Sequence, residues 1–403
     1  MLIKRKDFIV TGSLASASLM MPKFLRAFST DNIHQQLVPK GNKVLVVLQL
    51  SGGNDGLNTV IPVRNDDYYI NRPKLAIDKK DAIGITDEVS LHPELSALAN
   101  LYQEGNMSII NNVGYPNPDR SHFRSMDIWH TAADSNEYLT TGWVGKYLDA
   151  QCHGCDKPTQ ALELDDTLSL SMKGAYEKAI AFKDANRLYN TSQAKYFKAL
   201  DAAHHEAHAE APVDYLYKTM TETISSAEYI FKQSKLCPAK GDYPNNDIGN
   251  SFKTIASLIL SDINTKVYYV SLGSFDTHVG QHEKQQNLFK QMNAAIDAFA
   301  KDMKINNRFD DVLLMTFSEF GRRVSGNASG GTDHGTANNM FMIGGGLKQK
   351  GILNPMPDLK DLQDGDLKFK VDFKNVYATV LNNWLGADYK TILGKEYELM
   401  KFV

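Results

Sequence analysis

The stretch Lys43–Leu50, KVLVVLQL, decides the fold class of this 403-residue chain. All of its residues except Lys43 and Gln49 are apolar. A continuous apolar run of this length is typical of a strand that is buried on both faces of a parallel sheet. The run stops at Ser51–Gly56, SGGNDG, whose glycines and polar residues predict a turn where the strand ends.

Four further apolar runs repeat this pattern along the chain. We predict strands at Met107–Val113, Lys266–Leu272, Asp311–Phe317 and Met340–Ile343. Helical spacing of apolar residues alternates with these strands, at Pro93–Glu104, Glu283–Lys304 and Val376–Leu385. This alternation predicts an α/β fold of three layers, in which a mostly parallel sheet carries helices on both faces.

The middle of the chain departs from this alternation. Residues from about 190 to 240 are polar and helical in pattern, without strand signals. We interpret them as a helical insertion or cap on a single α/β domain that spans residues 31–403.

The first 30 residues have the pattern of an export signal. A positive start at Lys4–Lys6 precedes Ile9–Pro22, which is uncharged and too short to span a bilayer, and small residues follow at Ala27–Ser29. Arg5–Ile9, RKDFI, resembles the twin-arginine signal with Lys in place of the second Arg, so a Tat-like and a Sec route both stay open. We expect the export machinery to deliver the chain to the periplasm or the extracellular space, with no membrane span after signal removal. The alternative is an N-terminal amphipathic or buried helix.

Charge and cysteine content limit the other function classes. The formal net charge is -3 and there is no long basic block, which argues against nucleic acid as a partner. Cys152 and Cys155 have the spacing of a redox or zinc pair, while Cys237 stands alone. A local disulfide, a thiol redox site and two unrelated surface cysteines all remain open.

Acidic and histidine side chains follow the ends of several predicted strands, where open α/β sheets form their sites. The candidate metal ligands are Asp55, Asp276, His278, Glu319, Asp333 and His334. Crowded carboxylates repel one another unless a cation neutralises them. We therefore predict one or two divalent ions. Zinc or manganese suits mixed nitrogen and oxygen ligands, and calcium or magnesium suits a site dominated by carboxylates.

Such a site suits the transfer of a phosphoryl or sulfuryl group, since two metals can clamp the attacking and leaving oxygens. Ser121, on the loop after the second strand, is the candidate nucleophile. Arg120, Arg124 or Arg322 is the candidate for holding the non-bridging oxygens.

Simpler interpretations exist for three of these residues. Asp55 lies in an Asn-Asp-Gly sequence and has the character of a turn residue. Ser121 has the character of a helix N-cap. Glu319, which two arginines follow closely, has the character of an ordinary ion-pair partner.

Seven short motifs carry a family resemblance. They are LQLSGGNDGLNTVIP (Leu48–Pro62), LHPEL (Leu91–Leu95), DRSHF (Asp119–Phe123), FDTH (Phe275–His278), SEFGRR (Ser318–Arg323), GTDHG (Gly331–Gly335) and DFKNVYATVLNNWLG (Asp372–Gly386). In this order they resemble the domain of unknown function 1501 family, over essentially the whole chain after the signal. The resemblance implies a bacterial exported protein with a fold like that of the alkaline phosphatase and sulfatase superfamily.

The superfamily pattern implies roles for individual positions. Asp55 is similar to the metal aspartate after the first strand, and Ser121 to the nucleophile. Asp276 is similar to the aspartate of a second metal site, with His278 or His282 as its histidine partner. His334 resembles the late metal histidine. Where the superfamily commonly has Asp-His, this chain has Ser318–Phe320, so the histidine is missing and Glu319 stands in its place.

These observations lead to one main functional hypothesis. The chain is expected to be an exported metal-dependent hydrolase of phosphate or sulfate esters of small molecules or glycans. The alternative is a non-catalytic exported binding or assembly protein that retains the hydrolase fold. A thiol redox protein that uses Cys152 and Cys155 is a third hypothesis.

Overall fold

The computed structural model describes residues 41–151, 159–195 and 211–403, without the side chains of residues 211–222. Residues Lys40–Val403 form one compact unit. The expected export signal and the Cys152–Cys155 pair lie outside the described residues, so their interpretation stays a prediction.

A central sheet of nine strands, counted among the described residues, organises the compact unit. Its strand order is β11-β5-β10-β9-β1-β8-β6-β7, and β14 pairs with β5. The five strands predicted from apolar runs are β1 (Val44–Leu50), β5 (Met107–Gly114), β8 (Val267–Leu272), β9 (Val312–Phe317) and β10 (Asn338–Ile343). The short strands of the sheet are β6 (Ala161–Glu163), β7 (Ile180–Ala181), β11 (Gly351–Ile352) and β14 (Val371–Asp372).

The direction of the strands explains why distant residues meet. β1 runs parallel to β8 and β9, and β10 runs antiparallel to both β9 and β5. The carboxyl ends of β1, β5, β8 and β9 therefore lie at the same edge of the sheet as the start of β10. The sheet is mostly parallel, as predicted, with β10 as its antiparallel strand.

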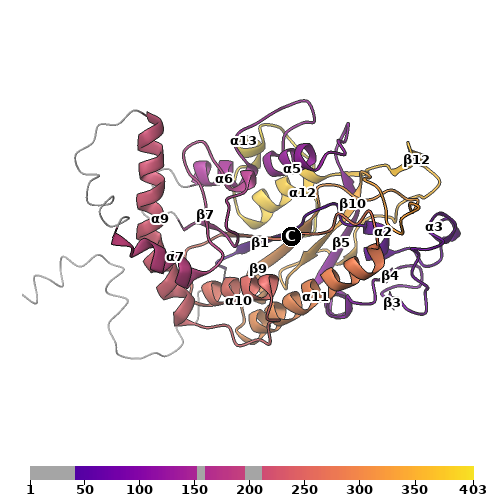
Figure 1. Ribbon diagram of the computed structural model, residues 1–403, viewed down its shortest axis with the longest axis horizontal. Coiled ribbons are helices and arrows are strands. Elements are labelled where there is room, and N and C mark those ends of the chain that lie inside the picture. The colour runs from indigo at the N-terminus through magenta and orange to yellow at the C-terminus, as the bar shows by residue number, and fades with distance from the viewer. Residues whose placement is uncertain (1–40, 152–158, 196–210) are drawn as a thin grey trace, which may run out of the picture. The chain divides into compact units, whose positions relative to one another are not determined.

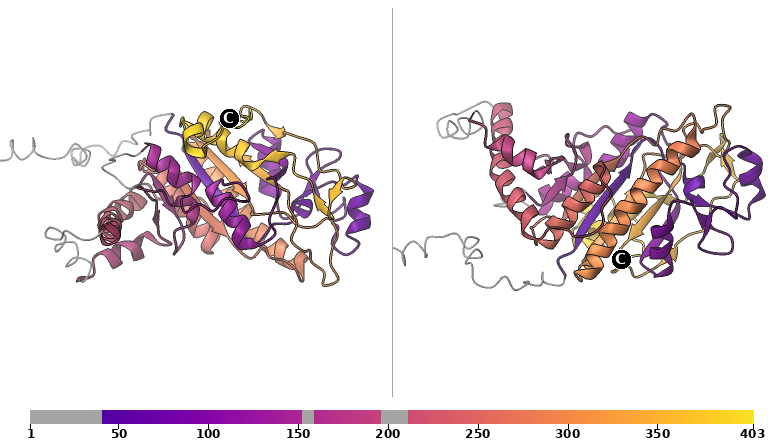
Figure 2. Two further views of the ribbon diagram at one scale, coloured as in Figure 1. Left: turned by 90° about the horizontal axis from the view of Figure 1, so that it is seen from above. Right: turned by 60° about the horizontal axis from the view of Figure 1, so that its bottom comes forward.

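Helices cover both faces of the sheet, which confirms the three-layer α/β fold (Figures 1 and 2). One layer contains α4 (Ser96–Gln103), α10 (Asp247–Leu260) and α11 (Gln281–Ile305). The other contains α5 (His122–Thr131), α6 (Trp143–Gln151), α12 (Phe373–Thr379) and α13 (Tyr389–Leu393). Along β1, Val46 and Leu48 join the first hydrophobic core, while Leu45 and Val47 join the second. Because β1 packs against a hydrophobic core on each face, nearly all of its residues are apolar.

Short elements complete the described part of the chain. They are α2 (Gly56–Thr59), β2 (Val60–Ile61), α3 (Asp66–Asn71), β3 (Ile83–Gly84), β4 (Ser90–Leu91), β12 (Leu362–Gln363) and β13 (Asp366–Leu367). Strands β2, β4 and β3 form a small sheet of their own.

Two helices, α7 (Ala185–Ser192) and α9 (Ala211–Leu236), lie within or next to the segment predicted as a helical insertion. Helix α9 packs against α7 and α10. The proposed role of this segment as a cap stays a prediction. Among the described residues, no helix has the length and apolar character that crossing a membrane requires.

Candidate metal centre

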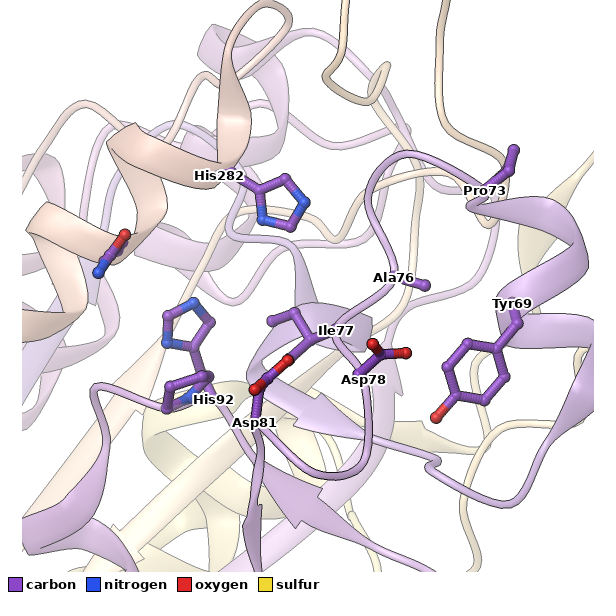
Figure 3. A pocket seen from close by; sticks show the side chains of 10 residues that line it. Tyr69, Pro73, Ala76, Ile77, Asp78, Asp81, His92 and His282 are labelled. Atoms are coloured by element: carbon purple, nitrogen blue, oxygen red, sulfur yellow. The ribbon is translucent and has the colours of Figure 1, made fainter.

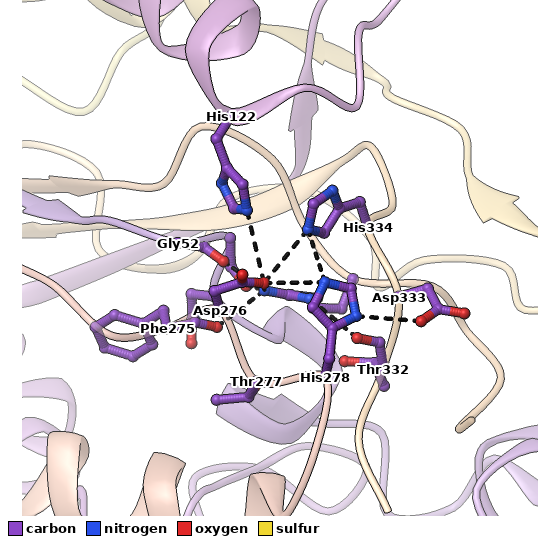
Figure 4. Close-up of polar contacts among 12 residues, drawn as sticks. Gly52, His122, Phe275, Asp276, Thr277, His278, Thr332, Asp333 and His334 are labelled. Atoms are coloured by element: carbon purple, nitrogen blue, oxygen red, sulfur yellow. Dashed lines mark hydrogen bonds and ion pairs between the residues drawn. The ribbon is translucent and has the colours of Figure 1, made fainter. Parts of the chain in front are cut away.

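Four side chains converge at the carboxyl edge of the sheet (Figure 4). Asp276 and His278 follow β8, His334 precedes β10, and His122 is the first residue of α5. The Oδ1 atom of Asp276 lies 3.1 Å from Nε2 of His278, 3.3 Å from Nε2 of His334 and 3.6 Å from Nε2 of His122. The strand order brings together side chains that lie more than 200 positions apart in the sequence.

Each of the three imidazoles is held through its other nitrogen. Nδ1 of His122 lies 2.9 Å from Oε1 of Glu319, and Nδ1 of His278 lies 3.2 Å from Oδ1 of Asp333. Nδ1 of His334 lies 2.8 Å from the backbone oxygen of Arg120. Carboxylate and carbonyl oxygens only accept hydrogen bonds, so each Nδ1 carries the proton. The lone pair of each Nε2 then faces the cluster, as in histidines that bind metals.

When the three rings are neutral, their Nε2 atoms are acceptors that surround the Asp276 carboxylate, and the donor to Oδ1 of Asp276 is Arg322, from outside the cluster. Nε2 of His278 and Nε2 of His334 lie only 2.9 Å apart, next to the Asp276 carboxylate. Nε2 of His122 is buried and has no hydrogen-bond partner among the described residues. Facing lone pairs repel, and a buried polar atom without a partner is costly. A cation at the centre of the cluster would relieve both.

The spacing of the converging atoms fits one small divalent ion. Zinc–nitrogen bonds of about 2.0–2.1 Å place tetrahedral ligand atoms roughly 3.3 Å apart. Four of the six separations among the ligand atoms, at 2.9, 3.1, 3.3 and 3.6 Å, lie around that value. One ligand atom from each of His122, Asp276 and His334 lies within 4.8 Å of the others, and His278 is the neighbour of Asp276 and His334 outside this group of three. Three imidazoles and one carboxylate are a typical ligand set for zinc.

Arg322 sets the charge of Asp276. Its Nη2 lies 2.7 Å from Oδ1 of Asp276. Partial burial opposes ionisation of this carboxyl group, but the hydrogen bond and charge of Arg322, with smaller help from His334 and His278, lower its pKa to about 2. Asp276 is therefore an anion at neutral pH. The hydrogen bond to Glu319 raises the pKa of His122, whereas burial lowers the pKa of His334.

Two glycines let the turn after β1 approach Asp276. Gly52 has φ +116, and a Cβ built on it would lie 2.4 Å from the backbone nitrogen of Asp276. A Cβ on Gly53, with φ +75, would lie 2.3 Å from the ring of Phe320. The glycines that mark the end of the first predicted strand are therefore also required by the close packing of the site.

Glu319 lies behind His122 instead of among the converging atoms. Its side chain is completely buried, and its Oε1 accepts hydrogen bonds from the Gly52 amide at 2.7 Å and from His122. The structure therefore gives this carboxylate a supporting role, not the expected role of metal ligand. Asp333 supports His278 in the same way, although it is exposed.

Asp55, which was expected to bind metal, belongs to a separate buried pair. Its Oδ2 lies 2.5 Å from Nη1 of Arg72 and 2.5 Å from Nε2 of Gln281, and its Oδ1 accepts the amide of Leu57 at 3.2 Å. Arg72 already neutralises this carboxylate, which also caps α2. The turn-residue interpretation of Asp55 thus agrees with the structure better than the metal interpretation.

Three residues were predicted to act on a substrate: Ser121, Arg120 and Arg322. Their surroundings differ. Ser121 is exposed and occupies the N-cap position of α5, but its side chain makes no capping hydrogen bond. The Arg120 guanidinium pairs with the buried carboxylate of Asp366. The arrangement therefore leaves the Ser121 hydroxyl beside His122 as the candidate nucleophile.

Arg322 cannot hold a substrate in this structure. Its side chain is completely buried, and it donates to Asp276 and to backbone oxygens of the loops around it. Those oxygens belong to Gly52, Gly53, Phe275 and Thr332. These contacts favour a structural role over the expected contact with ester oxygens, because Arg322 joins the loops and orients Asp276.

His122 is the residue that sequence reasoning left out of the metal set. It lies in the DRSHF motif directly after Ser121, but the superfamily pattern directed attention to the serine. A second signal was available, because the motif follows the carboxyl end of a predicted strand. His122 brings a third imidazole to this edge of the sheet, from the start of α5.

Comparisons with solved structures give similarities of low sequence identity. Among solved structures, the chain is similar to a protein of the alkaline phosphatase superfamily from Vibrio parahaemolyticus, with 11% identity, TM-score 0.40 and coverage of 88% of this chain and 69% of that chain. It is also similar to PsFucS1 sulfatase from Pseudoalteromonas sp., with 8% identity, TM-score 0.39 and coverage of 89% and 70%. The phosphonate monoester hydrolase SpPMH from Silicibacter pomeroyi gives 8% identity, TM-score 0.40 and coverage of 88% and 77%.

The family assignment rests on the sequence. Comparison with curated proteins found no match. The model of the family described as "Protein of unknown function (DUF1501)" matches residues 92–399, which include all four converging side chains. The chain therefore belongs to the DUF1501 family.

Proposed function

We propose that this protein is an exported, metal-dependent hydrolase of phosphate or sulfate esters. The observation that carries the proposal is the convergence of three imidazole Nε2 atoms on the Asp276 carboxylate, with each Nδ1 held by an acceptor oxygen. Because nitrogen ligands dominate, we propose one zinc ion or a similar transition metal, held by His122, Asp276, His278 and His334. Calcium and magnesium prefer oxygen ligands and fit this set less well.

The chemistry of the site follows from its charge. When bound, a divalent ion supplies Lewis acidity and favours the ionised form of a nearby hydroxyl group. The chain's own contribution is orientation: Glu319, Asp333 and the Arg120 carbonyl fix the three imidazoles. Rigid support of this kind keeps a site in its working geometry.

Ser121 is the proposed nucleophile. Its hydroxyl is exposed at the start of α5, immediately before His122, and makes no capping bond. It would attack the phosphorus or sulfur atom, and the alcohol of the ester would leave with a proton. Water would then release the phosphate or sulfate from the serine.

Metal analysis and an ester panel test this proposal together. The mature chain is purified, and its metal content is measured before and after dialysis against a chelator. Hydrolysis is then measured for aryl phosphates, aryl sulfates and sugar sulfates, with and without added zinc or manganese. We expect about one metal per chain and metal-dependent hydrolysis that Ser121→Ala abolishes. No bound or activating metal, together with no activity on any ester, would refute the proposal.

Export is a separate part of the proposal, since it depends on residues 1–30. Fusing these residues to a periplasmic reporter in a bacterial host tests it directly. We expect export of the fusion and loss of export when Arg5 and Lys6 are both changed to Gln. A reporter that stays in the cytoplasm would contradict this part alone.

A non-catalytic, metal-binding protein is the second candidate. It is favoured by one observation: neither Arg322, which is buried, nor Arg120, which pairs with Asp366, is free to hold ester oxygens. The guanidinium of Arg124 likewise donates to the backbone oxygens of Ser135 and Glu137. Stoichiometric metal without any ester hydrolysis would select this candidate.

A further inference from the structure

A cavity lies apart from the four converging side chains (Figure 3). It has a volume of about 460 Å³, within the range of about 300–1,000 Å³ typical of small-molecule pockets. Three segments line it: the chain from Tyr69 to Asp81, His92 and Pro93 after β4, and His282 and Gln286 on α11. None of the converging metal-centre residues is part of this lining.

His92 supplies this pocket with a hydrogen-bond donor. It is 96% buried, since only 4% of it is exposed, and its ring packs edge-on against Phe289. Its Nδ1 accepts the Glu94 amide at 3.2 Å, so the proton of the neutral ring is on Nε2. Burial lowers the pKa of His92 to about 4, which keeps the ring neutral at pH 7. Among the described residues, we find no hydrogen-bond acceptor for this Nε2–H, which is therefore available to a ligand.

Other residues of the lining supply acceptors and an apolar surface. Asp78 and Asp81 are exposed carboxylates that line the pocket. The Tyr69 hydroxyl donates to the Val63 backbone oxygen at 3.2 Å, which fixes the ring as part of the wall. Gln286 gives its amide hydrogen to Glu94, and its carbonyl oxygen is a further acceptor.

This mixture of groups selects the chemical class of the ligand. A phosphate or sulfate would be repelled by the two carboxylates. An ammonium ion would satisfy the carboxylates but has no acceptor for the His92 N–H. A hydroxyl group both donates and accepts hydrogen bonds. Neighbouring hydroxyls of one molecule can therefore accept from the His92 N–H and donate to the carboxylates. A flat apolar face on the same molecule would suit the Tyr69 ring.

We propose that this pocket binds an uncharged sugar ring. The donor from His92 and the acceptors from Asp78 and Asp81 would hold its hydroxyl groups, while Tyr69 would cover one face of the ring. This inference goes beyond the proposed ester hydrolysis, because it concerns a different cavity and needs neither metal nor ester. The first turn of α11 nevertheless connects the two sites: Gln281 accepts hydrogen bonds from Thr277 and Thr332, which directly precede His278 and Asp333.

Titration calorimetry and saturation-transfer NMR on the metal-free protein test the inference. The probes are glucose, galactose, mannose and N-acetylglucosamine, with lactose and maltose as disaccharides, and spermidine and inorganic phosphate as charged counterparts. We expect saturable binding of at least one neutral sugar and none of phosphate. His92→Phe keeps an aromatic ring against Phe289 but removes the donor. We expect it and Asp81→Ala each to weaken binding roughly five- to tenfold.

Matched variants keep the outcome unambiguous. Asp87→Ala removes an exposed aspartate outside the pocket and should leave sugar affinity unchanged. His334→Ala removes a metal-centre residue and should also leave it unchanged, which separates this inference from the proposed hydrolase. The inference is overturned if no sugar of the panel binds, if binding is insensitive to both pocket variants, or if spermidine binds in place of the sugars. Thermal unfolding curves confirm that each variant is folded.

Discussion

The buried carboxylate of Glu319 accepts the Nδ1–H of His122 at 2.9 Å, although 197 positions separate the two residues in the sequence. The same oxygen accepts the amide of Gly52, so the turn after β1, the loop after β9 and the start of α5 meet at one atom. This contact fixes the tautomer of His122 and directs its Nε2 at Asp276. Glu319, a predicted metal ligand, thus supports His122, which was not among the predicted ligands.

Changing Glu319 to Gln tests this relationship. Glutamine keeps the shape and an acceptor oxygen but loses the negative charge that strengthens the hydrogen bond to His122. Loss of such a supporting partner commonly costs 10–100-fold in metal affinity. We expect zinc affinity, measured by competition with a chromophoric chelator, to fall by about that factor while the fold is retained.

The control for this variant is Glu88→Gln, which makes the same change at an exposed position outside the site. Its zinc affinity should equal that of the parent protein. Equal affinity in Glu319→Gln and the parent would mean that His122 needs no support, and would contradict the assignment.

Two histidines four positions apart, His278 in the loop after β8 and His282 in the first turn of α11, allow a sharper test of the metal ligands. His278 lies 2.9 Å from His334 through the two Nε2 atoms, whereas Nε2 of His282 lies 3.1 Å from the Lys74 backbone oxygen. We expect His278→Ala to lower zinc affinity at least tenfold and His282→Ala to leave it unchanged. Isothermal titration with zinc at neutral pH measures both. Equal effects of the two variants would remove His278 from the ligand set.

The strands and the position of the site were predictable from the sequence, because apolar runs and the residues that follow them are local features. Asp276 and His278 are an example, since a polar pair directly after a buried strand indicates a site at the sheet edge. The direction in which a strand runs depends on its partners in the sheet and is not a local feature of the sequence. β10 was predicted as a strand, but only its pairing with β5 and β9 shows that it is antiparallel.

The roles of individual side chains depended on long-range partners and were not predictable in this way. Asp55 pairs with Arg72, and Arg322 donates to carbonyl groups from three separate loops. The sequence of the turn around Asp55 does not predict that an arginine 17 positions later neutralises this carboxylate. A carboxylate at a strand end can therefore be a ligand, a supporting group or half of an ion pair, and only the fold decides.

Arg322 and its neighbour Arg323 allow the same Arg→Ala change to be compared at a buried and at a partly exposed position, by the loss of folding stability. The Arg322 side chain is buried although Asp276 is exposed, and its removal would leave Asp276 without its cation and several backbone oxygens without donors. We expect Arg322→Ala to destabilise the fold by roughly 3–5 kcal/mol, because three buried backbone oxygens lose their donor. Arg323 is partly exposed and its contact with Asp366 spans 3.7 Å, so Arg323→Ala should cost about 1 kcal/mol or less. Urea unfolding measures both, and similar losses for the two variants would contradict the structural role of Arg322.

Glu163, at the end of β6, gives a prediction for the pH dependence of stability. Its side chain is buried, with one oxygen accepting the Ser169 amide at 2.8 Å, and burial raises the pKa of Glu163 to about 7. Between its ordinary pKa of 4.5 and about 7, the folded chain binds a proton that the unfolded chain has released. Stability contributed by this group is therefore present below about pH 4.5 and is lost as the pH rises towards 7.

Glu163→Gln removes this titration but keeps an acceptor for Ser169. Relative to the parent protein, the variant should gain roughly 2–3 kcal/mol between pH 5 and pH 8, because each pKa unit corresponds to about 1.4 kcal/mol. Unfolding by urea at both pH values measures the gain. Glu88→Gln, which is exposed, should show no such difference between the two pH values. If Glu163→Gln and the parent keep a constant difference across this range, the buried carboxyl group titrates normally and the prediction is wrong.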